Sequence, residues 1–286
     1  MLTKLRRWRW VLHVFAVRWR IRAGYLWSVP RVYRNWWAWP LPKLGVGVVL
    51  ELRGGARYYI RPHSTDLSVV NEAVILDPYL RSGYIQLPAN SVIVDVGANI
   101  GDFAVQLALR CPRGCVYAVE PLAENVKMIA LNSLLNDLTA RIQVVPVALG
   151  AQPGESDICV AGNASSAYFV DQRAPVERVR VTTLPLLMAD YNIEWIDLLK
   201  LDCEGAEWDI FPACEAVLPK IGQICMEYHT ANGWTGERLA EWLQARGFET
   251  RISAGPWNGA LWARSITLAA RSRPEPGAQA PPAIAP

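Results

Sequence analysis

The sequence has few of the residues that build metal centres and lacks the cysteine spacing of a disulfide framework. Its 286 residues include three histidines and six cysteines, and the cysteines show no paired Cys-x-x-Cys spacing. Cys111 and Cys115 form CPRGC, which lacks the His or Cys partners of a zinc site. We predict that most of the cysteines are buried free thiols, as expected in a reducing compartment.

Long apolar runs are also missing from the N-terminus. The stretch from Trp10 to Val17 has eight residues and is followed by Arg18, Arg20 and Arg22, with no small-residue cleavage site. A transmembrane helix needs about 20 apolar residues. We therefore predict neither a span nor a secretory signal, and a cytoplasmic location.

Acidic residues are absent from residues 1–50, which carry ten Lys or Arg and seven of the 13 tryptophans. The rest of the chain has 19 basic and 26 acidic residues. A basic amphipathic helix fits an anionic membrane surface, and it fits equally a helix docked on the protein's own body. We expect no nucleic-acid partner. The residues that would share one helix face are Leu5, Trp8, Leu12, Phe15 and Trp19.

Composition divides the chain into four parts. Residues 1–43 are the basic, Trp-rich segment, whose last tryptophans, Trp36 to Trp39, precede Pro40 and suggest a packed turn. Residues 44–90 form a lead-in, residues 91–271 the main domain, and residues 272–286 a Pro- and Ala-rich tail expected to be disordered. Within the lead-in we predict strands at 45–54 and 56–62 around Gly54-Gly55, then a helix from Thr65 or Asp66 to about Leu80.

In the main domain, apolar runs alternate with helical patterns, which is typical of a mostly parallel sheet with helices on both faces. Short β segments between 155 and 184 interrupt the alternation, and the last two strands, 248–253 and 259–270, are expected to form an antiparallel hairpin. The predicted main strands are 91–97, 114–120, 142–149, 196–205 and 221–229, and the predicted helices are 101–110, 123–135, 205–217 and 236–246.

The run DVGANIG, residues 95–101, follows the first main strand. Ligands of such sheets bind at the carboxyl ends of the strands, where Gly97 lets the backbone approach and Gly101 opens a helix. A pyrophosphate turn prefers G-x-G-x-x-G, whereas this turn has G-x-x-x-G preceded by Asp95. The acid favours a cofactor that carries an amine. Glu120, about 20 residues further on, is placed to accept hydrogen bonds from ribose hydroxyls.

Five pieces in order, VDVGANIGDF, AVEP, LN at Leu131-Asn132, VALG and DLLKLDCEGAE, resemble the FkbM family of S-adenosylmethionine-dependent methyltransferases. The resemblance covers roughly residues 57–250 and includes Arg61, Thr65 and Asp66 in the lead-in. It departs from the family at Cys203, where valine is more usual, and in a loose Ser-rich segment at 163–170.

The resemblance implies a Rossmann-like class I methyltransferase fold with an antiparallel last strand, here with a basic N-terminal helical extension. It implies O-methylation of a hydroxyl on a sugar, a glycolipid or a related metabolite, with S-adenosyl-L-methionine as cofactor. It assigns the methionine part of the cofactor to the turn from Asp95 through Gly97, Ala98 and Asn99 to Gly101. It assigns the ribose to Glu120, and the adenine to Ala148 and Leu149.

A hydroxyl nucleophile gains from a general base, typically by 10²–10⁴-fold. Candidates are Asp202 and Glu204 after the fourth main strand, and Glu227 and His229 at the end of the fifth. Members of each pair share one side of an extended segment, so the pairs can converge beside the cofactor. Glu207 is expected to favour the dipole of the following helix. An Mg²⁺ site at these carboxylates is a less favoured alternative.

Two other functions remain open from the sequence. One is a nicotinamide-dependent oxidoreductase, which the missing third glycine of the turn disfavours. The other is a non-catalytic adaptor that uses the N-terminal helix on a membrane surface. The methyl acceptor is not readable, and the loops at 155–184 and 229–236 are expected to shape specificity.

Overall fold

The computed structural model describes residues 27–159, 176–203, 205–229, 235–254 and 258–266. Several predicted features lie outside these residues: the helix face from Leu5 to Trp19, the β segment at 165–170, Glu204 and the tail at 272–286. No helix in the described part is both long and apolar enough to cross a bilayer.

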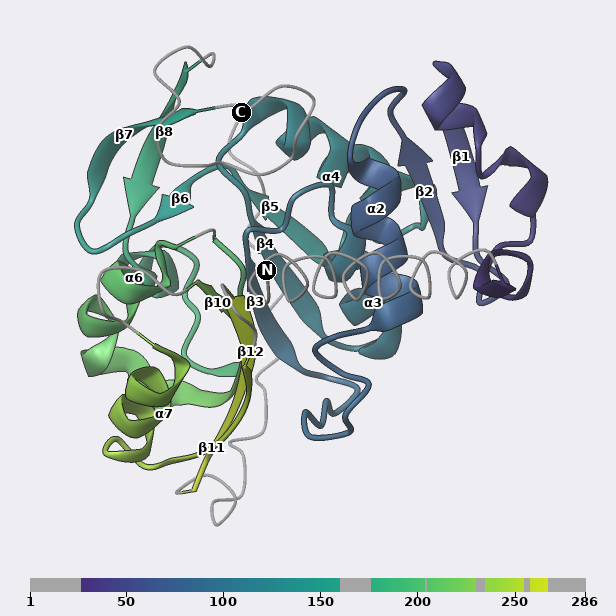
Figure 1. The fold of residues 1–286 in the computed structure, drawn as a ribbon. Coiled ribbons are helices and arrows are strands. Elements are labelled where there is room, and N and C mark those ends of the chain that lie inside the picture. Colours follow the sequence, from purple (N-terminus) through teal and green to yellow (C-terminus); the bar gives the residue numbers. More distant parts are fainter. Residues whose placement is uncertain (1–26, 160–175, 204, 230–234, 255–257, 267–286) are drawn as a thin grey trace, which may run out of the picture.

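A seven-stranded sheet in the order β11-β12-β10-β9-β3-β4-β5 forms the centre of the molecule (Figure 1). Pairings from β10 through to β5 are parallel, and β12 runs antiparallel to both of its neighbours. The predicted Rossmann-like fold with an antiparallel last strand is confirmed. The strands are β3 (Val92–Val96), β4 (Cys115–Val119), β5 (Ile142–Val145), β9 (Ile196–Leu201), β10 (Ile221–His229), β11 (Phe248–Ala254) and β12 (Asn258–Ser265).

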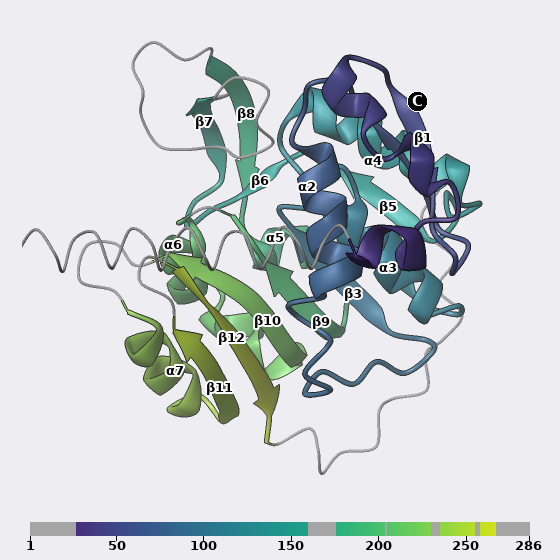
Figure 2. The same cartoon turned by 45° about the vertical axis from the view of Figure 1, so that its right-hand side comes forward.

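Helices cover both faces of this sheet (Figures 1 and 2). One core contains Ile93 and Ile129, and the core on the other face contains Leu199 and Phe211. Every residue of β9 is buried, which explains why the strand reads as a continuous apolar run. One face carries α2 (Asp66–Asn71), α3 (Asp102–Arg110) and α4 (Ala123–Leu135), and the other carries α5 (Leu184–Asp190), α6 (Glu207–Ala213), the 3-10 helix η4 (Glu215–Lys220) and α7 (Gly236–Gln244).

The predicted strand at 142–149 is in fact two strands in two sheets. β5 ends at Val145, and Pro146 follows without the N–H that would continue the ladder. The chain then forms β6 (Ala148–Leu149), which joins β7 (Gly154–Cys159) and β8 (Val176–Thr182) in a small separate sheet.

Other boundaries also differ from the prediction. The lead-in helix continues from α2 into a π-helical turn, η3 (Glu72–Leu76), and ends before Asp77, which precedes Pro78 and has a φ of 46°. The predicted strand at 196–205 ends at Leu201, and the helix predicted at 205–217 is split into α6 and η4, which contain Pro212 and Pro219.

Residues 27–60, named here the N-terminal lobe, pack against the main domain and share its core. The buried Tyr33 hydroxyl donates a 2.7 Å hydrogen bond to Asn71 Oδ1, and the Tyr58 hydroxyl donates to the Asp102 carbonyl at 2.9 Å. The lobe contains the 3-10 helices η1 (Trp36–Ala38) and η2 (Leu41–Leu44) and the antiparallel pair β1 (Val48–Glu51) and β2 (Arg57–Ile60), as predicted for a hairpin.

Tryptophans of the lobe do not form the packed turn that the sequence suggests. Trp39 is half-buried and its Nε1 donates to Asn71 Oδ1 at 3.3 Å, but Trp36 and Trp37 are exposed. Their rings contact each other edge to face, with centroids 6.3 Å apart. Trp39 therefore faces the core of the molecule, whereas Trp36 and Trp37 face the solvent.

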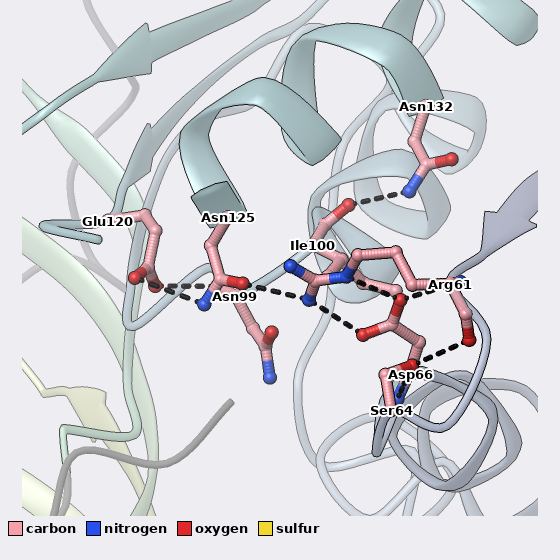
Figure 3. A network of polar contacts seen from close by, with 8 residues as sticks. All are labelled: Arg61, Ser64, Asp66, Asn99, Ile100, Glu120, Asn125 and Asn132. Carbon is pink, nitrogen blue, oxygen red and sulfur yellow. Dashed lines mark hydrogen bonds and ion pairs between the residues drawn. The ribbon is translucent and has the colours of Figure 1, made fainter. Parts of the chain in front are cut away.

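A polar network joins the end of the lobe to the main sheet (Figure 3). Arg61 forms a bidentate pair with the fully buried Asp66, at 2.7 and 2.9 Å. Its Nη2 also donates to Asn125 Oδ1 at 3.0 Å, and Asn125 Nδ2 donates to Glu120 Oε1 at 3.3 Å. The lead-in is thus hydrogen-bonded, through side chains, to a residue at the end of β4.

Replacing Tyr33 by alanine should lower the free energy of unfolding by about 3–5 kcal/mol, because it opens a cavity under the lobe and removes a buried hydrogen bond. Trp37→Ala is the control, since this side chain is exposed, and it should change that free energy by less than about 0.5 kcal/mol. Urea unfolding measures both. Equal effects would contradict the packing of the lobe described above.

Arg61→Ala should cost about 3–5 kcal/mol of stability, because the carboxylate of Asp66 stays buried without its cation. Arg178→Ala removes an ion pair whose partners, Arg178 and Glu155, are 64% and 60% exposed, and should cost under about 1 kcal/mol. Thermal or urea unfolding of the two variants provides the comparison. Similar losses would mean that the Arg61 pair is worth no more than a surface contact.

Candidate active site

The turn after β3 is shaped by three residues with left-handed backbone, Gly97 (φ 72°), Asn99 (φ 52°) and Gly101 (φ 80°). A Cβ on Gly97 would lie 1.9 Å from the carbonyl oxygen of Asp202, so only glycine fits where the ends of β3 and β9 meet. Gly101 is the N-cap of α3. Gly101 opens the helix as the sequence predicts, whereas the close approach at Gly97 is that of the Asp202 carbonyl.

A cavity of about 520 Å³ opens beside this turn, at the carboxyl ends of the parallel strands. Its position is the one expected where the strand order of the sheet reverses, here between β3 and β9. The predicted site residues that line it are Gly97, Asn99, Glu120, Ala148, Leu149 and Asp202. Gly150 to Ile158 form another part of the wall, so the first strand of the 155–184 region lines the cavity. Its role in specificity stays a prediction.

Glu120 is 95% buried at the end of β4, where it holds the turn in place. Its carboxylate accepts hydrogen bonds from the backbone N–H of Asn99 at 2.9 Å and of Leu122 at 3.0 Å. Burial raises the pKa of Glu120 to about 7, although these hydrogen bonds and Lys200 oppose the shift. The side chain still faces the cavity, and it is suited to accept hydrogen bonds from a polar ligand when it is ionised.

Asn99 presents an unused acceptor to the cavity. Its Oδ1 is buried and has no hydrogen-bond partner among the described residues. Figure 3 shows the side chain pointing away from the Arg61–Glu120 network. Because a buried amide oxygen without a partner is costly, this atom marks a place where a ligand donor such as an amine fits.

Asp95 lies behind the turn and does not line the cavity. It is fully buried, and its Oδ1 is 3.1 Å from Nζ of Lys200, the residue directly opposite on β9. Burial raises the pKa of Asp95, and the ammonium opposes that shift. Lys200 Nζ also donates to the Gly97 carbonyl at 3.0 Å, so Asp95 acts on the turn through Lys200. The sequence predicts that Asp95 holds the ligand's amine, whereas its position beside Lys200 favours a supporting role.

The other two predicted turn residues also support the backbone. Ala98 is 1% exposed, and its N–H donates to the carbonyl of Val119 at 3.1 Å. Gly101 packs against Ile129 of α4: a Cβ added to Gly101 would lie 3.4 Å from the nearest atoms of Ile129. Neither lines the cavity. Both residues shape the path of the turn, and a direct contact with the cofactor stays a prediction.

Asp202 faces both the cavity and a group of acids next to it. Tyr79 donates a hydrogen bond to Asp202 Oδ2 at 3.2 Å. Burial raises the pKa of Glu72, and the charges of Glu227 and Asp202 raise it further. Burial also raises the pKa of Tyr79, again with contributions from Asp202 and Glu227. The three carboxyl groups of Glu72, Asp202 and Glu227 therefore share one region, which we name the acid group.

His229 is the last residue of β10 and lies next to Glu227. Its Nε2 is 3.9 Å from Glu227 Oε1, and its Nδ1 is 3.5 Å from Oε1 of the buried Glu207. Glu207 also accepts from the backbone N–H groups of Cys203 and Gly205, both at 3.2 Å. Asp202 and Glu227 act on the same two neighbours, Glu72 and Tyr79, but Glu227 and His229 do not line the cavity itself. Convergence of the two predicted pairs beside a cofactor stays a prediction, since Glu204 lies outside the described residues. Glu207 caps the turn and contacts His229, which goes beyond the dipole role predicted for it.

Sequence reasoning missed three residues of this site: Lys200, Glu72 and Tyr79. Lys200 had a signal, because a charged residue inside the apolar run DLLKL must be paired when the strand is buried. Glu72 and Tyr79 come from the lead-in, and no local pattern indicates that they reach the ends of β9 and β10. Among the described residues, which do not include Glu204, no set of three or more His, Cys, Asp or Glu side chains is arranged to hold a metal ion.

Known proteins resemble this chain in sequence over the part that contains the site. AMB antimetabolite synthetase AmbE of Pseudomonas aeruginosa is 29% identical over 228 residues, which is 64% of this chain and 11% of that protein. The 31-O-demethyl-FK506 methyltransferase FkbM of Streptomyces tacrolimicus is 27% identical over 209 residues, 62% of this chain and 80% of that protein. The chain thus spans only a small part of AmbE and most of the Streptomyces protein.

A crystal structure of methyltransferase FkbM from Methylobacillus flagellatus KT is 15% identical and aligns with a TM-score of 0.47, covering 70% of this chain and 53% of that one. The profile of the methyltransferase FkbM domain matches residues 95–250, more than half of the chain, from Asp95 at the turn to the middle of β11. This chain belongs to the FkbM methyltransferase family.

Proposed function

We propose that this FkbM-family methyltransferase uses S-adenosyl-L-methionine and methylates a hydroxyl oxygen of a sugar, a glycolipid or a related metabolite. The observation that carries the proposal is the position of Asp202, which lines the cavity on one side and belongs to the acid group on the other. A cofactor site and an acceptor site would then meet at one carboxylate. The family assignment sets aside a nicotinamide oxidoreductase on the same fold.

The residues present fit S-adenosyl-L-methionine. Asn99 Oδ1 offers an unused acceptor for the amine, and Gly97 lines the cavity beside it, where the methionine part would lie. Glu120 would hold the ribose hydroxyls, and Ala148 and Leu149 would contact the adenine. When bound, the cofactor supplies a methyl group that is already activated on a sulfonium. The chain's own contribution is orientation and the exclusion of water.

On the acceptor side, Asp202 is placed to take the proton of the reacting hydroxyl. Tyr79 fixes one of its oxygens by a hydrogen bond and leaves the other available. Glu72 and Glu227 add acceptors for neighbouring hydroxyls, because an ionised carboxylate only accepts hydrogen bonds. A polyhydroxylated acceptor suits such a surface. The Streptomyces relative is named for a substrate that lacks an O-methyl group, which also supports transfer to oxygen.

Calorimetry with S-adenosylhomocysteine tests the cofactor part. We expect binding that strengthens as the pH rises through about 7 and then levels off, because the ribose hydroxyls donate to the ionised form of Glu120, whose pKa is about 7. Glu120→Gln should weaken binding by about 10- to 100-fold and remove this pH dependence. Glu194→Gln, at an exposed position, is the control. A folded wild-type protein that does not bind would contradict the proposal.

Transfer of labelled methyl groups to a glycan and glycolipid extract tests the acceptor part. Asp202→Asn should lower the turnover number by about 10²–10⁴-fold, as expected for loss of a general base. Its affinity for S-adenosylhomocysteine should change little. Asp209→Asn is a matched control, since Asp209 also lines the cavity but lies outside the acid group. Equal losses in the two variants, or label appearing on nitrogen or carbon, would refute the assignment.

A further inference from the structure

The N-terminal lobe exposes an unusual share of the molecule's large apolar side chains. Thirteen such side chains are exposed in the described part of the chain, and six of them fall within residues 27–49. Trp27 and Leu44 are each 72% exposed, and Trp37 is 64% exposed. The others are Trp36, Val46 and Val49. We name these six side chains the apolar patch.

The apolar patch is not a failure of the lobe to fold. The same segment buries Tyr33 completely and anchors Trp39 by a hydrogen bond to Asn71. Asn35, next to Trp36, is fixed to β1, because its Nδ2 donates to the Val49 carbonyl at 2.8 Å and its Oδ1 accepts from the Glu51 N–H at 2.9 Å. The exposed side chains therefore project from a well-anchored backbone.

The segment that carries the apolar patch is also basic and has almost no acids. The exposed basic residues between 27 and 57 are Arg31, Arg34, Lys43, Arg53 and Arg57. Glu51 is the single acidic residue of this range, and it is paired with Arg34 at 3.4 Å. The guanidinium of Arg31 lies 5.5 Å from the centre of the Trp27 ring, so a positive charge and an apolar ring are presented together.

Both views of the molecule place the lobe at its edge, with β1 on the side away from β7, β8 and α7 (Figures 1 and 2). A surface at the edge can meet a flat partner without moving the main sheet.

We propose that the apolar patch and its basic rim dock the protein on an anionic lipid surface. Tryptophan rings favour the interface between headgroups and acyl chains, and aliphatic tips such as Leu44 and Val46 gain by entering the acyl region. Arginine and lysine around them attract acidic headgroups. A nucleic-acid surface would match the charge but would not use Leu44, Val46 and Val49. The inference is independent of the methyl acceptor.

Co-sedimentation of the full chain with vesicles tests the proposal. Binding is expected to vesicles of phosphatidylcholine mixed with phosphatidylglycerol, to fall with added salt, and to be much weaker with phosphatidylcholine alone. The variant Trp36→Ser/Trp37→Ser should lower the partition coefficient on the order of tenfold for each tryptophan. Arg31→Ala and Lys43→Ala should each lower it about fivefold.

Matched controls lie on other elements. Leu186→Ser on α5 and Lys220→Ala on η4 remove an exposed apolar and an exposed basic side chain, and should leave the partition coefficient unchanged. Circular dichroism of each variant checks folding.

The proposal fails if Trp36→Ser/Trp37→Ser binds like the wild type, which would place any vesicle contact elsewhere in the chain. It fails equally if neutral and anionic vesicles bind the protein alike. Absence of vesicle binding, with self-association in light scattering that the tryptophan variant abolishes, would identify the apolar patch as an interface between copies of this chain.

Discussion

Lys200 and Asp95 face each other across the centre of the sheet, and the site depends on this buried pair. They are register partners on β9 and β3, the strands between which the order of the sheet reverses. Burial lowers the pKa of Lys200, but Asp95, Asp202 and Asp102 outweigh it and hold that pKa above its ordinary value. The ammonium stays charged and ties the Gly97 carbonyl to both strands. Since removal of one partner from a buried pair leaves an uncompensated charge, neither residue is free to vary alone.

The site has two halves, the cavity and the acid group, which lie on either side of this pair. On one side the turn, Glu120 and the small sheet enclose the cavity. On the other, Asp202 joins Glu72, Tyr79 and Glu227. Glu72 follows Asn71, the residue that anchors Tyr33 and Trp39 of the lobe. The lead-in is therefore part of the site as well as of the core, and the division between residues 44–90 and the main domain does not separate function.

Much of the fold was predictable because the strands are buried on both faces and the helices between them have clear periods. The turn was predictable for a similar reason, since glycines with left-handed backbone and the start of a helix are local demands on the sequence. Boundaries failed at prolines: Pro146 separates β5 from β6, and Pro78 ends the lead-in helix early. The exposure of Trp36 and Trp37 was missed because the sequence pattern of aromatic residues beside prolines is the same for buried and for solvent-exposed side chains.

The sequence by itself determined the parallel sheet, the glycine turn, the acid at the end of β4 and the family, because each of these is encoded by residues close together in the chain. Only the tertiary structure decided which acids meet. Asp95 is paired in the core with Lys200, 105 positions along the chain, and Tyr79 reaches Asp202 across 123 positions. Such contacts are set by the packing of whole elements around a buried charge, and no local pattern carries that information.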